Sequence, residues 1–159
     1  MNESTTLLDQ FDRRLIDSLY VEAMVLADEA RSYFDHHANA QRAVLGQQER
    51  LDFACEALKV TTRLMHVIAW LLTQRAIVSG ELPGTARHEA CNRLGEATAT
   101  DAAIAKAFSF DMMTLILASE DLYGRVARLE GQMLGLAGAG AADMRSPARE
   151  LLTRLERAF

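Results

Sequence analysis

The feature that most constrains this chain is the segment from Gln47 to Ser79, which contains neither glycine nor proline and ends at Gly80. It predicts one helix about 50 Å long, and apolar residues cover most of its circumference. We expect one seam, with steps of four and three, to face the core: Leu51, Cys55, Leu58, Thr62, Met65, Ala69, Leu72 and Ala76. A second seam lies beside it: Ala54, Ala57, Thr61, Leu64, Ile68, Leu71 and Val78. A helix this apolar needs more than one covering neighbour.

Two further long helices are predicted, over about residues 11–34 and 111–134. The apolar positions of the latter form one expected buried face: Met112, Leu115, Ile116, Ser119, Leu122, Tyr123, Val126, Leu129 and Met133. Helix-forming residues are plentiful and turn residues are few, so strands are not expected. The predicted fold is all-α, an antiparallel three-helix bundle whose long second helix is central.

The chain divides into a bundle and a tail. Residues 1–134 are expected to form the bundle, and residues 135–145 form a linker rich in glycine and alanine. Residues 146–159 predict a short amphipathic helix, because Ser146 is a good cap and Pro147 suits the first position. Its apolar edge provides candidate docking residues for a partner: Leu151, Leu155 and Phe159.

Charge and hydropathy exclude some classes of partner. Lys and Arg number 17 against 22 Asp and Glu, a net charge of −5, which argues against nucleic acid. The most apolar stretch, residues 64–78, is interrupted by polar side chains, so no membrane-spanning helix is expected. The polar N-terminus lacks the pattern of an export signal, and Cys55 and Cys91 are therefore expected as free thiols in the cytoplasm.

No pattern of catalytic or metal-binding residues emerges. None of the 4 histidines has a glutamate three residues before it, as a di-metal carboxylate bundle requires. His88 and Cys91 stand three apart, but two ligands do not make a structural zinc site. No nucleophile or phosphate-loop motif occurs. We expect no enzymatic activity, no cofactor and no metal.

Trp70, the single tryptophan, falls by helical angle in the narrow polar stripe of the long helix. An aromatic residue beside arginine on an exposed face is typical of a binding anchor. The sequence therefore indicates a candidate partner-binding surface: Asp52, Glu56, Arg63, His66, Val67, Trp70 and Gln74. The alternative is that Trp70 is core, which requires a further covering element such as a loop, the tail or a second subunit.

Several segments together resemble one family. The most specific run contains Thr61-Thr62-Arg63-Leu64-Met65, Ala69-Trp70-Leu71-Leu72 and Gln74-Arg75-Ala76. Ser18-Leu19-Tyr20-Val21-Glu22-Ala23-Met24 precedes it, and Arg93-Leu94-Gly95 and Leu122-Tyr123-Gly124-Arg125-Val126-Ala127-Arg128-Leu129 follow it. Over residues 15–135 the chain resembles the alphaproteobacterial RcdA family, the regulators of CtrA degradation.

The resemblance implies a homodimeric helical bundle that is a non-enzymatic proteolytic adaptor. Such an adaptor delivers client proteins of the cell cycle to the ClpXP protease, whose ClpX component is primed by a response-regulator adaptor. Two alternatives stay open: a helical dimeric regulatory or scaffold protein with no link to proteolysis, and a small-ligand protein with a pocket between its helices. The inward seams carry few ionisable residues, which argues against the ligand pocket.

Overall fold

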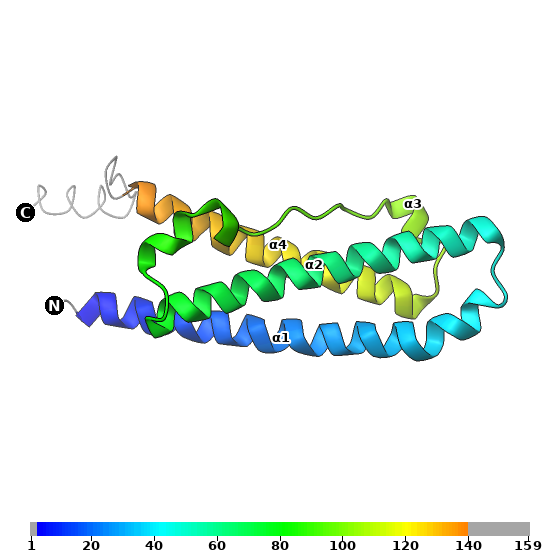
Figure 1. The fold of residues 1–159 in the computed structure, drawn as a ribbon, viewed down its shortest axis with the longest axis horizontal. Coiled ribbons are helices and arrows are strands. Elements are labelled where there is room, and N and C mark those ends of the chain that lie inside the picture. Colours follow the sequence, from blue (N-terminus) through cyan, green and yellow to red (C-terminus); the bar gives the residue numbers. More distant parts are fainter. Residues whose placement is uncertain (1–2, 140–159) are drawn as a thin grey trace, which may run out of the picture.

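The computed structural model describes residues 3–139 and consists of three long helices (Figure 1). They are α1 (Glu3–Arg42), α2 (Gln47–Ser79) and α4 (Phe110–Ala139). The first runs antiparallel to the other two, but the second and third run parallel to each other, because their connection returns the chain to the opposite end of the bundle. The antiparallel order that the sequence predicts therefore does not hold for that pair. The connection from α2 to α4 contains two short 3₁₀ helices and one short α-helix: η1 (Gly84–His88), η2 (Ala90–Asn92) and α3 (Ala102–Ala105). Within the described part there is no strand. The prediction of an all-α bundle with a long second helix is confirmed. The tail, with Leu151, Leu155 and Phe159, lies outside the described residues.

Both ends of α2 lie where the sequence predicts them. At the start, the backbone N–H of Gly46 donates to the Glu49 carboxylate at 2.8 Å, which satisfies one donor of the first turn. At the end, Gly80 adopts a left-handed conformation with φ of 81°. A residue with a Cβ would be strained there, and the glycine therefore stops the helix.

The other two long helices exceed their predicted bounds. α1 runs over Glu3–Arg42 rather than 11–34. α4 begins at Phe110, where the Ser109 hydroxyl accepts from the Met112 backbone N–H, and it continues to Ala139. The helix therefore extends through Gly135 into the expected linker, because alanine-rich neighbours offset the roughly 1 kcal/mol cost of each glycine.

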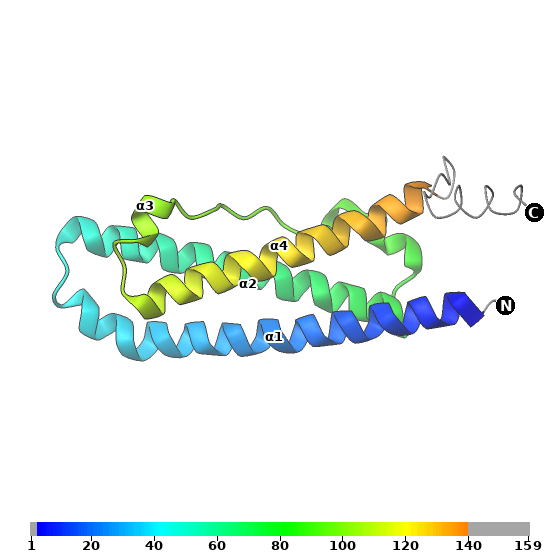
Figure 2. The same cartoon turned by 180° about the vertical axis from the view of Figure 1, so that it is seen from behind.

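The core lies between the three long helices, and α4 presents the face that its periodicity predicts. From α1 come Ile16, Leu19, Ala23, Leu26, Ala30 and Tyr33. From α4 come Met112, Leu115, Ile116, Leu122, Val126, Leu129 and Met133, with Ser119 buried among them and Tyr123 partly buried. Seen from behind, α4 lies nearer to the viewer than α2 and crosses in front of it (Figure 2).

The predicted orientation of α2 is wrong for its first seam, although Leu64 and Leu71 of the second seam are buried as expected. Of the seam expected in the core, Leu58 is 67% exposed and Met65 is 64% exposed, and Leu51, Cys55 and Leu72 are exposed too. The side chains that α2 buries lie on the opposite face and against α1: Phe53, Glu56, Val60, Arg63, Leu64, Val67, Trp70, Leu71 and Gln74. The error has a physical origin, because α2 has two apolar faces and periodicity alone does not say which one its neighbours cover.

Among the described residues, no helix has the length and apolarity needed to cross a bilayer.

The register of α2 can be tested with two leucines of the same helix. Leu71→Ala, at a fully buried position, should lower the free energy of unfolding by about 2–5 kcal/mol. Leu58→Ala should lower it by less than about 0.5 kcal/mol, since its side chain already contacts water. Urea unfolding at concentrations where the chain is monomeric measures both. Equal losses would contradict the orientation described here.

Candidate protein-binding surface

The structure places the predicted partner-binding residues inside the molecule. Val67 and Gln74 have no exposed surface, Glu56 and Arg63 are 1% exposed, and Trp70 is 3% exposed. Only Asp52 and His66 are partly exposed. The prediction that these seven residues form an open contact surface is therefore wrong for the single chain, and Trp70 belongs to the core.

The covering element is an extended segment, residues 93–101, which we call the strap. It runs from η2 to α3 beside α2 and α4, back along the length of the bundle (Figure 1). The sequence shows only a weak pattern here. Its contacts are hydrogen bonds to side chains of both helices, which residue periodicity does not reveal.

Arg63 is the centre of the contacts beneath the strap. Its guanidinium donates to the Thr98 carbonyl oxygen at 2.7 Å and to the Thr100 hydroxyl at 2.8 Å, both on the strap. It also donates to two side chains of α4, the Ser119 hydroxyl at 3.2 Å and the Glu120 carboxylate at 3.1 Å. One buried cation thus joins α2, the strap and α4.

Two carboxylates balance this cation. Glu120 also accepts the Thr100 backbone N–H at 2.7 Å. Glu56 accepts the Thr100 hydroxyl at 2.7 Å and pairs with Lys59 at 2.6 Å. Burial lowers the pKa of the Arg63 guanidinium, and the negative charges of Glu120 and Glu56 oppose that shift. Arg63 nevertheless remains protonated, because an arginine pKa lies far above physiological pH.

Trp70 is held at the other end of the strap. Its indole Nε1–H donates to Glu130 Oε1 at 3.1 Å. The same oxygen accepts the Leu94 backbone N–H at 2.7 Å and Arg93 Nε at 3.1 Å. Glu130 therefore fixes the tryptophan and the start of the strap with one carboxylate.

Close packing at Gly95 completes the cover. A Cβ on Gly95 would lie 2.7 Å from Nδ1 of the His66 ring, so the strap needs glycine at this position. The Tyr123 hydroxyl donates to the Gly95 carbonyl oxygen at 2.8 Å. The Nδ1 side of the partly exposed His66 ring therefore lies under the strap.

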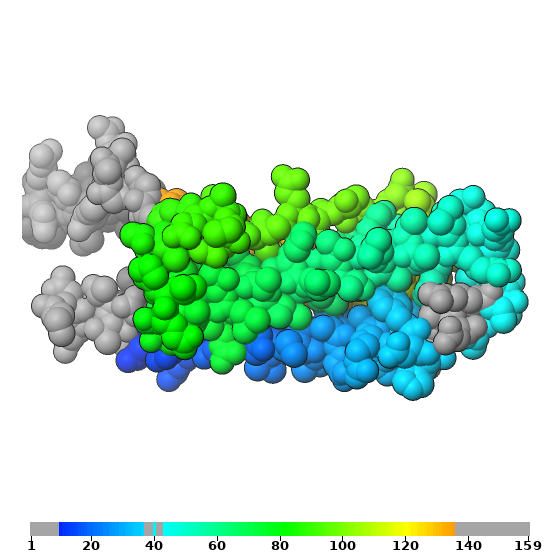
Figure 3. Space-filling model, in the orientation of Figure 1, coloured from blue at the N-terminus to red at the C-terminus, as the bar shows by residue number. Residues whose placement is uncertain are grey.

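The face of α2 turned away from the strap is open. It carries large apolar residues seven apart, Leu51, Leu58, Met65 and Leu72. Between them stands a row of smaller residues with the same spacing: Cys55, Thr62, Ala69 and Ala76. We call these eight residues the outer seam. Figure 3 shows α2 running along the middle of this side of the molecule.

A shallow groove between α1 and α2 continues the outer seam. It has a volume of about 320 Å³, and Met65 belongs to both the groove and the seam. The groove is lined mainly by apolar side chains from both helices, including Ala27, Phe34, Leu64 and Ile68. A contiguous exposed apolar surface of this kind is characteristic of protein–protein interfaces.

The polar side chains can be examined for a metal site and for exposed thiols. Among the side chains that the structure describes, no three of His, Cys, Asp or Glu come close enough to share a metal ion. Cys55, expected as a buried small hydrophobe, is exposed, and so is Cys91. Arg63 pairs directly with the partly exposed Glu120, and the buried Glu56 is connected to Arg63 through the Thr100 hydroxyl.

Glu130 provides a test of the strap. Glu130→Ala should leave the Trp70 and Leu94 N–H groups without their acceptor, at a cost of about 1–3 kcal/mol for each buried donor. We expect hydrogen exchange of the Leu94 amide to accelerate by roughly tenfold or more. Trp70 fluorescence should shift to longer wavelength. The control is Asp121→Ala, which removes an exposed carboxylate of the same helix. Unchanged exchange of the Leu94 amide in Glu130→Ala would show that Glu130 does not hold the start of the strap.

The comparisons with known proteins agree on one family. The model of a family described as a protein of unknown function, DUF1465, matches residues 8–159. The crystal structure of RcdA from Caulobacter crescentus CB15 superposes with a TM-score of 0.62 at 31% sequence identity, over 83% of this chain and 96% of that one. No protein of curated function matches at a significant level. The chain therefore belongs to the RcdA family, the family described as DUF1465.

Proposed function

We propose that this chain is a non-enzymatic adaptor that brings client proteins to a ClpXP-type protease in the cytoplasm. Its membership of the family that includes RcdA supports a role linked to proteolysis. The observation that carries the proposal is the outer seam, an apolar face kept open along almost the whole of α2. A cytosolic chain that keeps such a face open has a protein partner for it.

Binding alone is sufficient for this role. An adaptor that holds a client and the protease together raises the local concentration of the client at the protease. This requires two binding surfaces and no reacting group. The open outer seam could serve as one such surface, and the buried charges are engaged in hydrogen bonds within the bundle.

We further propose that the outer seam is where two copies of the chain pair. Residues repeated every seven positions lie along one line of a helix and favour packing against a second helix. Large residues alternate along the seam with small ones, which allow close approach of two backbones. An antiparallel pair brings Leu58 opposite Met65 of the second copy, and Leu51 opposite Leu72. The two-fold axis then passes near Thr62, because a symmetric pair uses the same patch of both subunits.

A binding experiment tests the adaptor role. Immobilised ClpX should retain the full chain when its response-regulator adaptor is present and should retain much less without it. An Arg125→Ala variant, which removes an exposed ion pair with Glu22 on the face between α1 and α4, is the control for nonspecific charge effects. If the chain is not retained with both proteins present, the link to proteolysis fails and the scaffold alternative is favoured.

Engineered thiols test the pairing of the outer seam. In a chain carrying Cys55→Ser and Cys91→Ser, Thr62→Cys should form a covalent dimer under mild oxidation. The matched control is Thr61→Cys, an exposed neighbour on α2 that lies beside α1 in the groove. Its thiol points away from the two-fold axis and should remain reduced. Equal cross-linking of the two variants, or none, would contradict this interface.

A further inference from the structure

The strap is an extended segment whose backbone is bonded to the helices along one edge. Its flanking residues are both extended, with φ of −79° and ψ of 154° at Arg93, and φ of −68° and ψ of 127° at Asp101. The Thr98 carbonyl oxygen accepts from a guanidinium of α2, and the Thr100 backbone N–H donates to a carboxylate of α4. Thr98 and Thr100 therefore turn these backbone groups toward the helices.

The opposite edge of the strap is formed by Ala97 and Ala99. In an extended chain the backbone groups of successive residues point to opposite sides, so these two residues direct theirs away from the helices. Their N–H and C=O groups form no hydrogen bond with any group that the structure describes. In both ribbon views the strap is an outer edge of the bundle, and no described helix lies beyond it (Figures 1 and 2). The strap thus presents the donors and acceptors of two residues to the solvent.

The side chains of this edge allow a second backbone to approach. Paired strands lie about 4.8 Å apart, and Ala97 and Ala99 carry only a methyl group each. Ala99 is exposed and Ala97 is partly exposed. Lysine and proline commonly protect an exposed strand edge from pairing, and neither occurs in residues 94–100. The edge is therefore open to an added strand.

The charges beside the edge favour a basic partner. Glu96 and Asp101, near its two ends, are exposed carboxylates, whereas the cation at its start, Arg93, already pairs with Glu130. Lysine or arginine side chains on an added strand would complement these carboxylates, which affects association rate and specificity more than affinity. The affinity comes from main-chain hydrogen bonds, which every peptide sequence except proline supplies.

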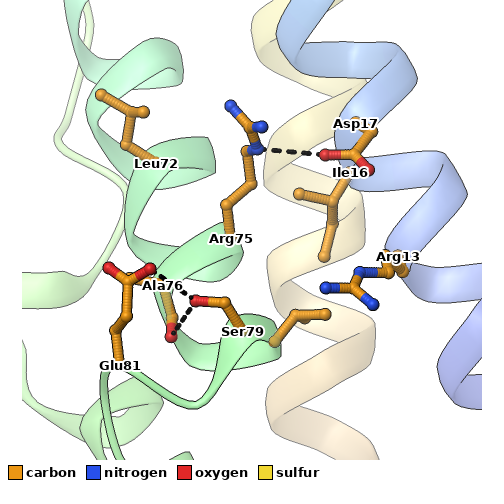
Figure 4. Close-up of a pocket in the computed structure, with 9 residues that line it drawn as sticks. Arg13, Ile16, Asp17, Leu72, Arg75, Ala76, Ser79 and Glu81 are labelled. Atoms are coloured by element: carbon orange, nitrogen blue, oxygen red, sulfur yellow. Dashed lines mark hydrogen bonds and ion pairs between the residues drawn. The ribbon is translucent and has the colours of Figure 1, made fainter.

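A hollow between α1 and α2 provides a control surface away from this edge (Figure 4). It has a volume of about 300 Å³, and its described lining, which includes Ile16 and Leu72, contains no residue of the strap. Two of its charged side chains, Arg75 and Asp17, pair with each other at 3.0 Å. A change at Arg75 therefore alters the hollow and leaves the strap as it is.

We propose that the outer edge of the strap binds an extended, basic peptide segment of a partner protein, which adds to the strap as a β-strand. The backbone of the added segment donates to the carbonyl oxygens of Ala97 and Ala99 and accepts from their N–H groups. The strap and the outer seam lie on different sides of α2, so both surfaces can be occupied at once. The inference depends neither on the adaptor role nor on pairing at the outer seam.

Amide hydrogen exchange in the full chain, followed by NMR, tests the proposal. The probe is a synthetic peptide of alternating valine and threonine, with a lysine at each end and both termini blocked. Without the peptide, the amides of Ala97 and Ala99 should exchange faster than those of Leu94 and Thr100, which are hydrogen-bonded. With a large excess of the peptide, exchange of the Ala97 and Ala99 amides should slow by about tenfold.

Substitutions on the edge separate the backbone contact from other effects. Ala97→Pro removes one outward donor but suits an extended chain, and it should weaken peptide binding by about fivefold. Ala99→Pro removes the other donor and should act in the same way. Ala97→Thr keeps the N–H group and should bind the peptide as the unchanged chain does, as should Arg75→Ala. Slow exchange of the Leu94 and Thr100 amides checks that the strap stays on the helices in each variant.

Three results would overturn the proposal. They are amides of Ala97 and Ala99 that stay unprotected in excess peptide, equal binding by Ala97→Pro and Ala97→Thr, and a loss of binding in Arg75→Ala as large as in Ala97→Pro. Protection that develops without peptide and grows with the concentration of the chain would show that a second copy pairs with the edge. That result would also refute the assignment to a partner peptide. Retention on ClpX is a separate measurement, so failure here is distinguishable from failure of the adaptor role.

Discussion

The guanidinium of Arg63 lies in the middle of α2 without contact with water, and its surroundings supply the acceptors that this burial requires. An unpaired buried charge costs several kcal/mol, so a helix that turns Arg63 inward needs partners on its neighbours. Glu120 and Ser119 of α4 provide part of the set, and the carbonyl and hydroxyl groups of the strap provide the rest. The strap is consequently part of the folded core although it has no regular secondary structure.

Covering one side of α2 with the strap leaves the opposite side open. α1 packs on one flank of α2, and α4 with the strap covers the buried charges. No described element covers the outer seam, where Leu58 and Met65 contact water. The bundle thus buries its polar stripe and exposes an apolar one, and for a single chain this arrangement is stable only because Arg63, Glu56, Glu130 and Trp70 are hydrogen-bonded.

This arrangement suits a protein that works by contact. Hydrogen bonds from the buried side chains hold α2 against α4 and the strap. Because α2 is already ordered, a protein that binds its open apolar face costs little additional conformational entropy. Membership of the RcdA family and this surface point in the same direction, toward recognition of other proteins.

The amino-acid sequence by itself determined the helical class, the bounds of α2 and the buried face of α4. Those features depend on local propensity, on Gly80 as a terminator and on a single apolar stripe between Met112 and Met133. Only the tertiary structure decided which side of α2 faces inward, and with it the burial of Trp70 and Arg63 and the exposure of Leu58. The physical reason is that α2 has two plausible inner faces. The choice between them depends on long-range hydrogen bonds that Arg63 and Trp70 donate to acceptors on Thr98, Thr100, Glu120 and Glu130, whose positions no local pattern encodes.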